Sequence, residues 1–387
     1  MKIRRKIWDP RRLFSLFTII FMFTVLENGC AQKPGNIKEL KEEIINLSKE
    51  YLELNKYASG VITRISYPDS LDLIYTSGYR DNKDLNALNG EELFIAASIT
   101  KTFMAVCILQ QMEENLLSLD DKVVKYVDKE TLRKLTRFKN RSYGNEITIE
   151  HLLRHTSGIV DYLNKGEVHL SGLNNNPNRN YSLQERLDFA LELGENTATN
   201  KPGKYYYSNT NYILLGIIAE KVDKKDISKI FENRIIKPLE LSNTSLNPSN
   251  TAINEMFNGY YENRDLTKFT LEFNRNNPAA GILTNVDDLI AFGKAVFQGA
   301  LFANDRTFVM MLDFNDGYGL GVMQFEKSRK TGRVIGHSGY DPGYTSYLIY
   351  LEDIDTCIVT VINQSELKVE MPAFLVVKIV AAFKDFL

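Results

Sequence analysis

A serine and a lysine three positions apart, Ser98 and Lys101, stand at the head of a long apolar run, residues 103–109. On a helix, residues three apart lie on the same face, one turn above the other. The apolar residues are not confined to one stripe, so we expect this helix to be buried nearly all round. Burial favours the neutral form of a lysine, which can then take a proton from a neighbouring hydroxyl. A serine in the first turn also lies near outward-pointing backbone N–H groups, which suits an attack that generates an oxyanion.

The Ser-x-x-Lys spacing alone also fits an ordinary buried helix start. It occurs a second time at Ser365 and Lys368, within the polar stretch that begins at Asn363. We interpret that second copy as part of a solvated turn. The first copy therefore needs support from the rest of the chain.

Periodicity predicts which elements position this pair. Residues 37–51 have the spacing of an amphipathic helix, and residues 373–387 form a second, mostly apolar one. β-branched and aromatic residues predict strands at 61–67, 73–79, 318–325, 333–337, 344–350 and 356–362. Two β-rich ends around a mainly helical middle predict an α+β fold with one antiparallel sheet flanked by helices. The sheet subdomain would take about 37–117 plus 271–387, and the helical insertion about 118–270.

The amino terminus has the form of an export signal. Six basic residues precede the apolar run Leu13–Leu26, which is short for a membrane span, and small residues follow it. We predict that residues 1–29 are the signal and that the domain occupies 30–387. Gly29 and Cys30 resemble a bacterial lipoprotein cleavage site, with attachment to the membrane by a lipid on Cys30. Cleavage after Ala31 and an uncleaved anchor are the alternatives, and each of these readings predicts a cell-envelope or periplasmic protein.

Composition excludes some partners. The 387 residues are 44% hydrophobic and 25% charged, with a net charge of −2 that gives no reason to expect nucleic acid as a partner. Cys107 lies in the apolar run and Cys357 in an apolar strand. We expect both thiols to be inert core residues rather than a disulfide framework.

Two further motifs complete a set. Tyr207 and Asn209 follow a Pro-Gly pair and an aromatic run, and His337 and Gly339 lie at the end of a strand. In the order Ser-x-x-Lys, Tyr-x-Asn and His-x-Gly, these motifs resemble the three signatures of the penicillin-recognising serine hydrolases. The nearest branch is similar to class C β-lactamases, D-alanyl-D-alanine carboxypeptidases and β-lactamase-like esterases. The resemblance implies the β-lactamase or penicillin-binding-protein type of fold.

The resemblance also implies roles for individual residues. Ser98 would attack the carbonyl group and become the acyl-enzyme. Lys101 and Tyr207 would share the general-base work, and Tyr207 would activate the deacylating water. Asn209 would hold the substrate's amide. No metal or organic cofactor is implied, and the partner is a small-molecule or peptide substrate.

His337 occupies the place where many relatives carry a lysine. In the family pattern the oxyanion hole would be the backbone N–H of Ser98 and that of Tyr340, the residue after Gly339. A lysine can anchor a substrate carboxylate, whereas a histidine with an ordinary pKa near 6.5 is mostly neutral at pH 7. We therefore expect esters or peptides to be turned over more readily than cephalosporins, with partial recovery of the anchor when His337 is protonated.

Several motifs resemble these signatures without their context. Residues 162–164 also spell Tyr-x-Asn but lack the Pro-Gly lead, and residues 330–332 spell Lys-Thr-Gly in what we predict to be a hairpin turn. His151 and His155 have zinc-compatible spacing without a third ligand, so we expect structural roles. Ser338 misses the Gly-x-Ser-x-Gly pattern, and no histidine follows it, so it is rejected as a nucleophile.

The sequence thus predicts an exported serine hydrolase that acts on a small ester, a D-amino-acid peptide or a β-lactam. The alternative is a binding module that keeps the fold and senses ligand without turnover. Such a module would have no use for Lys101 or Tyr207. The acyl donor, the leaving group and the oligomeric state stay open.

Overall fold

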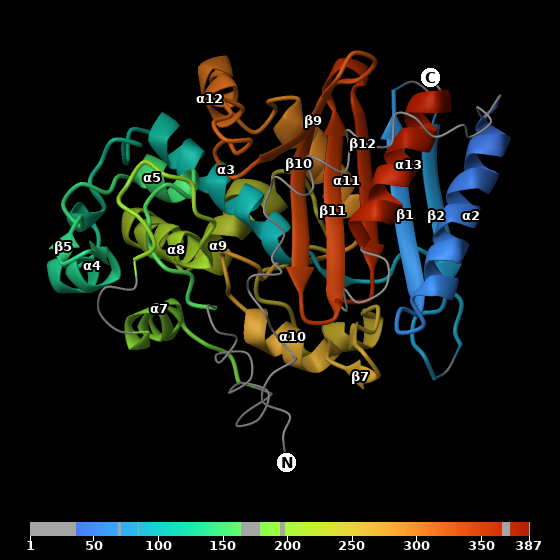
Figure 1. Cartoon of the computed structure of the whole chain (residues 1–387), viewed down its shortest axis with the longest axis horizontal. Coiled ribbons are helices and arrows are strands. Elements are labelled where there is room, and N and C mark those ends of the chain that lie inside the picture. Colours follow the sequence, from blue (N-terminus) through green and yellow to red (C-terminus); the bar gives the residue numbers. More distant parts are fainter. Residues whose placement is uncertain are drawn as a thin grey trace.

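A computed structural model describes residues 36–68, 71–83, 85–163, 179–193, 198–365 and 372–386. At its centre is a six-stranded antiparallel sheet in the order β2-β1-β12-β11-β10-β9 (Figure 1). The strands are β1 Gly60–Tyr67, β2 Leu71–Gly78, β9 Met323–Ser328, β10 Gly332–Asp341, β11 Tyr344–Leu351 and β12 Thr356–Ile362. Because β1 pairs with β12, both ends of the chain contribute to one sheet. The predicted α+β architecture is confirmed.

Helices cover both faces of the sheet (Figure 1). Helices α2 (Ile37–Leu54) and α13 (Pro372–Phe386) pack together on one face, and α11 (Val286–Phe297) packs against β1, β11 and β12 on the other. Successive residues of β12 alternate between two hydrophobic clusters, with Ile358 in one and Val359 in the other. Every residue of β11 and β12 is buried as a result. This explains why these strands are apolar without a polar face.

The remaining elements lie mainly beside the sheet. The helices are α3 Thr100–Glu113, α4 Lys129–Leu135, α5 Ile149–Leu153, α7 Leu183–Glu192, α8 Asn209–Asp223, α9 Ile227–Phe231, α10 Thr267–Asn274 and α12 Asp305–Met311. Short paired strands are β3 Phe94–Ile95 with β8 Leu283–Thr284, β4 Arg137–Phe138 with β5 Arg141–Ser142, and β6 Tyr260–Tyr261 with β7 Arg264–Asp265. Short 3-10 segments are η3 Ala97–Ile99, η4 Val123–Lys125, η6 Asn250–Glu255 and η7 Glu352–Ile354, and η5 Glu232–Ile236 is a short π-helical segment. Together, α4, α5, α7, α8 and α9 form the helical region at the left of Figure 1.

Helix α3 is the central element of this region. Every residue from Thr100 to Leu109 is buried, as its unstriped apolar sequence predicts. Cys107 on α3 and Cys357 on β12 are buried free thiols, which confirms that they are core residues. Since α3 begins two residues after Ser98 and contains Lys101, its position fixes where both side chains lie.

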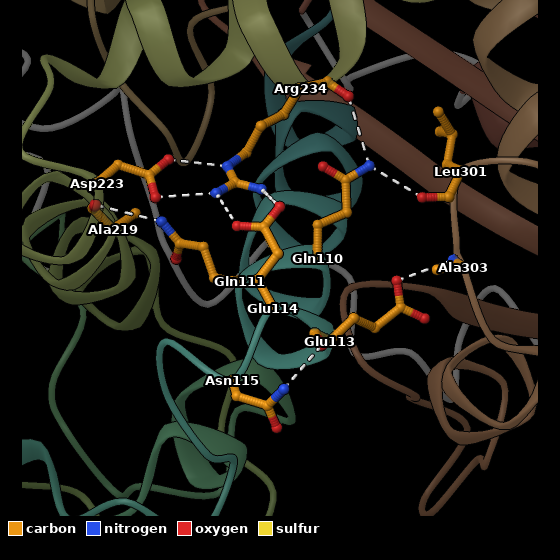
Figure 2. Close-up of polar contacts among 10 residues, drawn as sticks. All are labelled: Gln110, Gln111, Glu113, Glu114, Asn115, Ala219, Asp223, Arg234, Leu301 and Ala303. Atoms are coloured by element: carbon orange, nitrogen blue, oxygen red, sulfur yellow. Dashed lines mark hydrogen bonds and ion pairs between the residues drawn. The ribbon is translucent and has the colours of Figure 1, made fainter.

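The far end of α3 is held by a polar cluster (Figure 2). The Arg234 guanidinium on η5 lies between Asp223 at the end of α8 and Glu114 at the end of α3, with four N–O distances of 2.8–2.9 Å. The Glu113 carboxylate accepts a hydrogen bond from the backbone N–H of Ala303 at 2.9 Å. The bidentate pairs that Arg234 makes with Asp223 and Glu114 fix the geometry of this end as well as stabilising it. The helix is therefore tied to two neighbouring segments at the end remote from Ser98.

One predicted strand is shorter than expected. Residues 318–325 were predicted as a strand, but β9 begins at Met323. Gly317 and Gly321 have φ values of +75° and +74°, which an extended ladder does not accommodate. A Cβ atom on Gly321 would lie 2.5 Å from the Cβ of Ala105 on α3. The loop thus packs closely on α3, and Tyr318 is placed beside the candidate site.

The prediction of a solvated turn at Ser365 is wrong. Asn363, Gln364 and Ser365 are at most 1% exposed. The Asn363 side-chain oxygen accepts hydrogen bonds from two backbone N–H groups of the segment leading into β1, at 3.0 and 3.1 Å. These polar residues satisfy buried backbone groups, which hydropathy alone does not reveal. Lys368 lies outside the described residues.

Residues 1–35, which carry the predicted export signal and Cys30, also lie outside the described residues. Within the described ranges, no helix is both long enough and apolar enough to cross a membrane.

Candidate active site

Ser98 lies in η3, the single 3-10 turn that joins β3 to α3. Its neighbour Ala97 has a φ of +50°, which is uncommon for a residue with a side chain and is typical of constrained functional turns. From Glu92 to Leu109, every residue except Ser98 is at most 7% exposed. Ser98 is therefore the one side chain of this segment that lies at an accessible position.

Lys101 is fully buried directly below Ser98. Its Nζ atom donates to Ser98 Oγ at 2.9 Å, to the Asn209 side-chain oxygen at 2.7 Å and to the Ala279 carbonyl oxygen at 2.7 Å. Desolvation lowers the pKa of Lys101 to about 7, against the opposing effect of the Asp161 and Asp341 carboxylates. The lysine can therefore lose its proton near neutral pH, as a general base must.

Tyr207 completes the contacts around the serine hydroxyl. Its side chain hydrogen-bonds with Ser98, and Lys101 Nζ lies 4.9 Å from the centre of its ring. Burial raises the pKa of Tyr207 well above its ordinary value. Tyr207 is therefore a neutral phenol near pH 7, whose hydroxyl can both donate and accept a proton. Lys101 is left as the member of this trio that titrates near neutrality.

Asn209 lies at the start of α8 and joins two buried charges. Its side-chain oxygen accepts from Lys101, and its Nδ2 donates to the Asp161 carboxylate at 2.8 Å. Burial raises the pKa of Asp161. Asn209 keeps one amide hydrogen and one oxygen lone pair for the substrate role that the resemblance implies.

His337 on β10 is also fully buried. Its Nδ1 lies 2.7 Å from the Ser338 carbonyl oxygen, which can only accept, so Nδ1 carries the hydrogen and Nε2 accepts from the Tyr318 hydroxyl at 3.1 Å. Burial, with a further contribution from Lys101, lowers the pKa of His337 to about 3. The expectation of an ordinary pKa near 6.5 was wrong, because the sequence does not show this burial. His337 is a neutral group throughout the physiological pH range.

Strand β10 passes close to the serine turn. Its pairing with β9 ends at Gly336, and the following residues run beside η3. A Cβ atom on Gly339 would lie 2.2 Å from the Ala96 carbonyl oxygen, so only glycine permits this approach. Tyr340 follows it on the strand, and its hydroxyl donates to the Ser365 carbonyl oxygen. The predicted site residues on β10 are thus brought to the turn that carries Ser98.

The alternative motifs lie elsewhere or have other contacts. Lys330 is in the turn between β9 and β10, as predicted, and donates to the Lys384 carbonyl oxygen. Tyr162 is buried, while Asn164 lies outside the described residues. Ser338 Oγ contacts the Met323 sulfur at 3.7 Å. Among the described side chains of these motifs, Lys330, Tyr162 and Ser338 make no hydrogen bond to Ser98 or Lys101.

The two histidines of the helical region do not share a helix face. His151 caps the start of α5 through Thr148, whereas His155 lies beyond the helix end with a φ of +56°. In the described part of the chain, no group of three His, Cys, Asp or Glu side chains could hold a metal ion. His155 is instead buried against Tyr207, with ring centres 4.2 Å apart. It accepts a hydrogen bond from the Ser208 N–H at 3.1 Å, within the Tyr-x-Asn motif.

Sequence reasoning missed the roles of Asp161, His155 and Tyr318 in the surroundings of the site. Asp161 is separated from Asn209 by 48 positions, and no spacing rule connects them. Tyr318 was assigned to a strand, so its contact with His337 was not anticipated. These contacts depend on tertiary packing that periodicity does not encode.

Comparison with known proteins agrees with this arrangement. The antiparallel sheet flanked by helices is the fold shared by β-lactamases and penicillin-binding-protein-like structures. The family model "Beta-lactamase" matches residues 57–380, and the chain belongs to this family.

Individual relatives are more distant. Penicillin-binding protein 4* of Bacillus subtilis (strain 168) is 26% identical over 321 residues, covering 76% of this chain and 66% of the relative, so the chain spans only part of that protein's length. D-amino acid amidase from Ochrobactrum anthropi SV3, complexed with L-phenylalanine amide, aligns over 90% of this chain and 99% of its own with a TM-score of 0.75 and 22% identity. EstCE1, a hydrolase with promiscuous acyltransferase activity, covers 89% of this chain and 98% of its own with a TM-score of 0.66 and 17% identity. The structural likenesses show a shared fold.

The pKa of Lys101 predicts a pH dependence. For a neutral ester, kcat/KM should fall about tenfold per pH unit below about pH 7, since the ammonium form cannot accept the Ser98 proton. Because the Asp341 carboxylate raises the pKa of Lys101, the variant Asp341→Asn should move this limb to lower pH. Steady-state rates between about pH 5 and 9 test the prediction. A flat profile would contradict it, and loss of the limb in Asp341→Asn would assign it to Asp341.

Proposed function

We propose that this protein is a serine hydrolase that forms an acyl-enzyme on Ser98 from a small ester, an amide or a peptide. The observation that supports the proposal best is Lys101, buried, able to deprotonate near pH 7 and hydrogen-bonded to Ser98. Ser98 Oγ attacks the carbonyl carbon, and its proton passes to Lys101. The bond to the leaving group then breaks, and the Tyr207 hydroxyl relays the proton to the departing oxygen or nitrogen. Water hydrolyses the acyl-enzyme by the reverse route, with the backbone N–H groups of Ser98 and Tyr340 stabilising the oxyanion.

The substrate class follows from His337. His337 is neutral, and both of its ring nitrogens are already hydrogen-bonded, to Ser338 and Tyr318, so it lacks the charged donor with which a lysine anchors a carboxylate. A hydrogen bond to a charged partner exceeds a neutral one by up to about 2 kcal/mol. Substrates that depend on a carboxylate anchor, such as cephalosporins, should lose up to roughly thirtyfold, while uncharged esters and amides lose nothing. The structural likeness to an amidase complexed with L-phenylalanine amide adds amino-acid amides to the candidates.

A substrate panel tests this ranking. We expect p-nitrophenyl esters and D-amino-acid amides to be hydrolysed with a higher kcat/KM than a chromogenic cephalosporin. Because the pKa of His337 is lowered to about 3, the ratio of kcat/KM for an anionic ester to that for its neutral isostere should be constant between about pH 6 and 8. A histidine with an ordinary pKa near 6.5 would instead make this ratio rise as the pH falls. Efficient cephalosporin hydrolysis, or a ratio that rises on acidification and becomes constant in His337→Gln, would contradict the proposal.

We also propose that the protein is exported, on the support of its basic and apolar amino terminus. The mature chain should begin at Cys30, carrying a lipid, or at Gln32. Mass spectrometry of protein isolated from its host measures this. An intact Met1 would contradict it.

A further inference from the structure

Asp161 is a buried carboxylate that is connected to Ser98 by three successive hydrogen bonds, through Asn209 and Lys101. It is 4% exposed, and it makes no hydrogen bond to Ser98. One of its oxygens accepts from the backbone N–H of Leu163 at 3.0 Å, and the other accepts from the Asn209 Nδ2 at 2.8 Å. Both contacts require an oxygen at Asp161. An ionised carboxylate meets this requirement because it can only accept.

The contacts of Lys101 determine where its lone pair points. A neutral lysine has two N–H donors and one lone pair. The Asn209 and Ala279 oxygens can only accept, so they take the two N–H groups. Ser98 is then the remaining hydrogen-bond partner, and it is the one that can donate. The lone pair is therefore directed at the proton that it has to remove.

This alignment depends on which end of the Asn209 amide faces Lys101. If the amide were turned by 180°, its Nδ2 would donate to the lysine lone pair, and Lys101 would donate to Ser98 instead of accepting from it. The turned amide would also place its oxygen against the Asp161 carboxylate, which has no hydrogen to offer. Asp161 thus excludes the unproductive orientation.

We propose that Asp161 is a positioning residue, which holds the Asn209 amide with its oxygen on Lys101 and so directs the lysine lone pair at Ser98. The inference rests on the proposed function, in which Lys101 is the base for Ser98. It adds a fourth residue to the Ser98, Lys101 and Tyr207 set, acting without contact to the substrate. No spacing motif contains it.

The variant Asp161→Asn isolates this role because it changes polarity without changing shape. The asparagine side chain introduced at position 161 can accept from the Leu163 N–H only through its single oxygen. Its amide nitrogen then points at Asn209. That nitrogen requires an acceptor, so the Asn209 amide must turn. The double variant Asp161→Asn/Asn209→Asp exchanges the two groups and restores the side-chain hydrogen bond between positions 161 and 209, with an acceptor again facing Lys101. It is the matched rescue.

The rate of Ser98 labelling by a fluorophosphonate reports nucleophile activation without a known substrate. We expect Asp161→Asn to lower the plateau labelling rate at high pH by about tenfold or more, and the double variant to be labelled at least about threefold faster than Asp161→Asn. Asp341→Asn removes another buried negative charge near Lys101 but pairs with Asn274, and it should keep the plateau within about threefold. Circular dichroism melting curves show whether each variant is folded.

Three results would overturn the proposal: an unchanged plateau in folded Asp161→Asn, an equal loss in Asp341→Asn, or a double variant no faster than the single one. If Asp161→Asn does not fold, the double variant alone tests the proposal. A plateau labelling rate more than about tenfold below the wild type would then contradict it. A wild-type protein that is not labelled on Ser98 would instead refute the proposed function. The two failures are therefore distinguishable.

Discussion

The variant Ser98→Ala should reduce kcat/KM for an activated ester by a factor of about 10⁴ or more, with the fold unchanged. The oxygen that forms the acyl-enzyme is removed, and no other hydroxyl can replace it in the same place. Tyr207 lies nearest, but burial keeps it a neutral phenol because its pKa is well above the ordinary value. Hydrolysis of p-nitrophenyl acetate, measured beside a thermal melting curve, tests the expectation.

Ser338→Ala is the matched control. Ser338 lies on β10 next to His337, and its hydroxyl contacts the Met323 sulfur rather than Lys101. We expect this variant to retain activity within about threefold of the wild type, as substitutions outside the reacting groups usually do. If Ser338→Ala loses activity and Ser98→Ala keeps it, the assignment of the nucleophile is wrong.

The variant Lys101→Arg should lower kcat/KM by a factor on the order of 10³. Arginine keeps a positive charge at the position, but a guanidinium does not deprotonate at any pH of interest, so it cannot accept the Ser98 proton. The variant therefore separates two functions of Lys101, accepting a proton and carrying a positive charge. Lys101→Met removes both and should lose about as much.

Rates of acyl-enzyme formation measure these two variants most directly, because general-base assistance acts on that step. Retention of more than about a tenth of the wild-type rate in Lys101→Arg would show that Lys101 acts through its charge. A loss in Lys101→Met alone would lead to the same conclusion. The pH profile of the wild type gives an independent check.

Much of this site could be predicted because its information is local. Ser98 and Lys101 are three positions apart on one helix, and the apolar run that follows them shows that the helix is buried. Tyr207 and Asn209 likewise share one segment at the start of α8.

Alternation and β-branched composition located four of the six sheet strands closely. The strand predicted at 333–337 was too short, since β10 continues past His337 to Asp341. The strand predicted at 318–325 was too long, because Gly317 and Gly321 at positive φ keep Tyr318 out of the ladder.

The rest depends on tertiary contacts that leave no local pattern. The low pKa of His337 comes from its complete burial near Lys101, whereas in the sequence it stands between serine and glycine residues at a strand end. Asp161 reaches Asn209 across 48 positions, and its neighbours give no periodic signal. The polar stretch at Asn363 appeared solvated in sequence because buried backbone groups that need partners cannot be read from side-chain types. Each of these differences concerns the environment of a residue rather than its identity.

Mapping a covalent adduct tests the central claim most directly. The wild-type protein is treated with a fluorophosphonate, digested and sequenced by tandem mass spectrometry. We predict a single adduct on Ser98 that forms more slowly as the pH falls below about 7, where Lys101 becomes protonated. An adduct on any other residue, or no adduct on folded protein, would contradict the account and favour a ligand-sensing module without turnover.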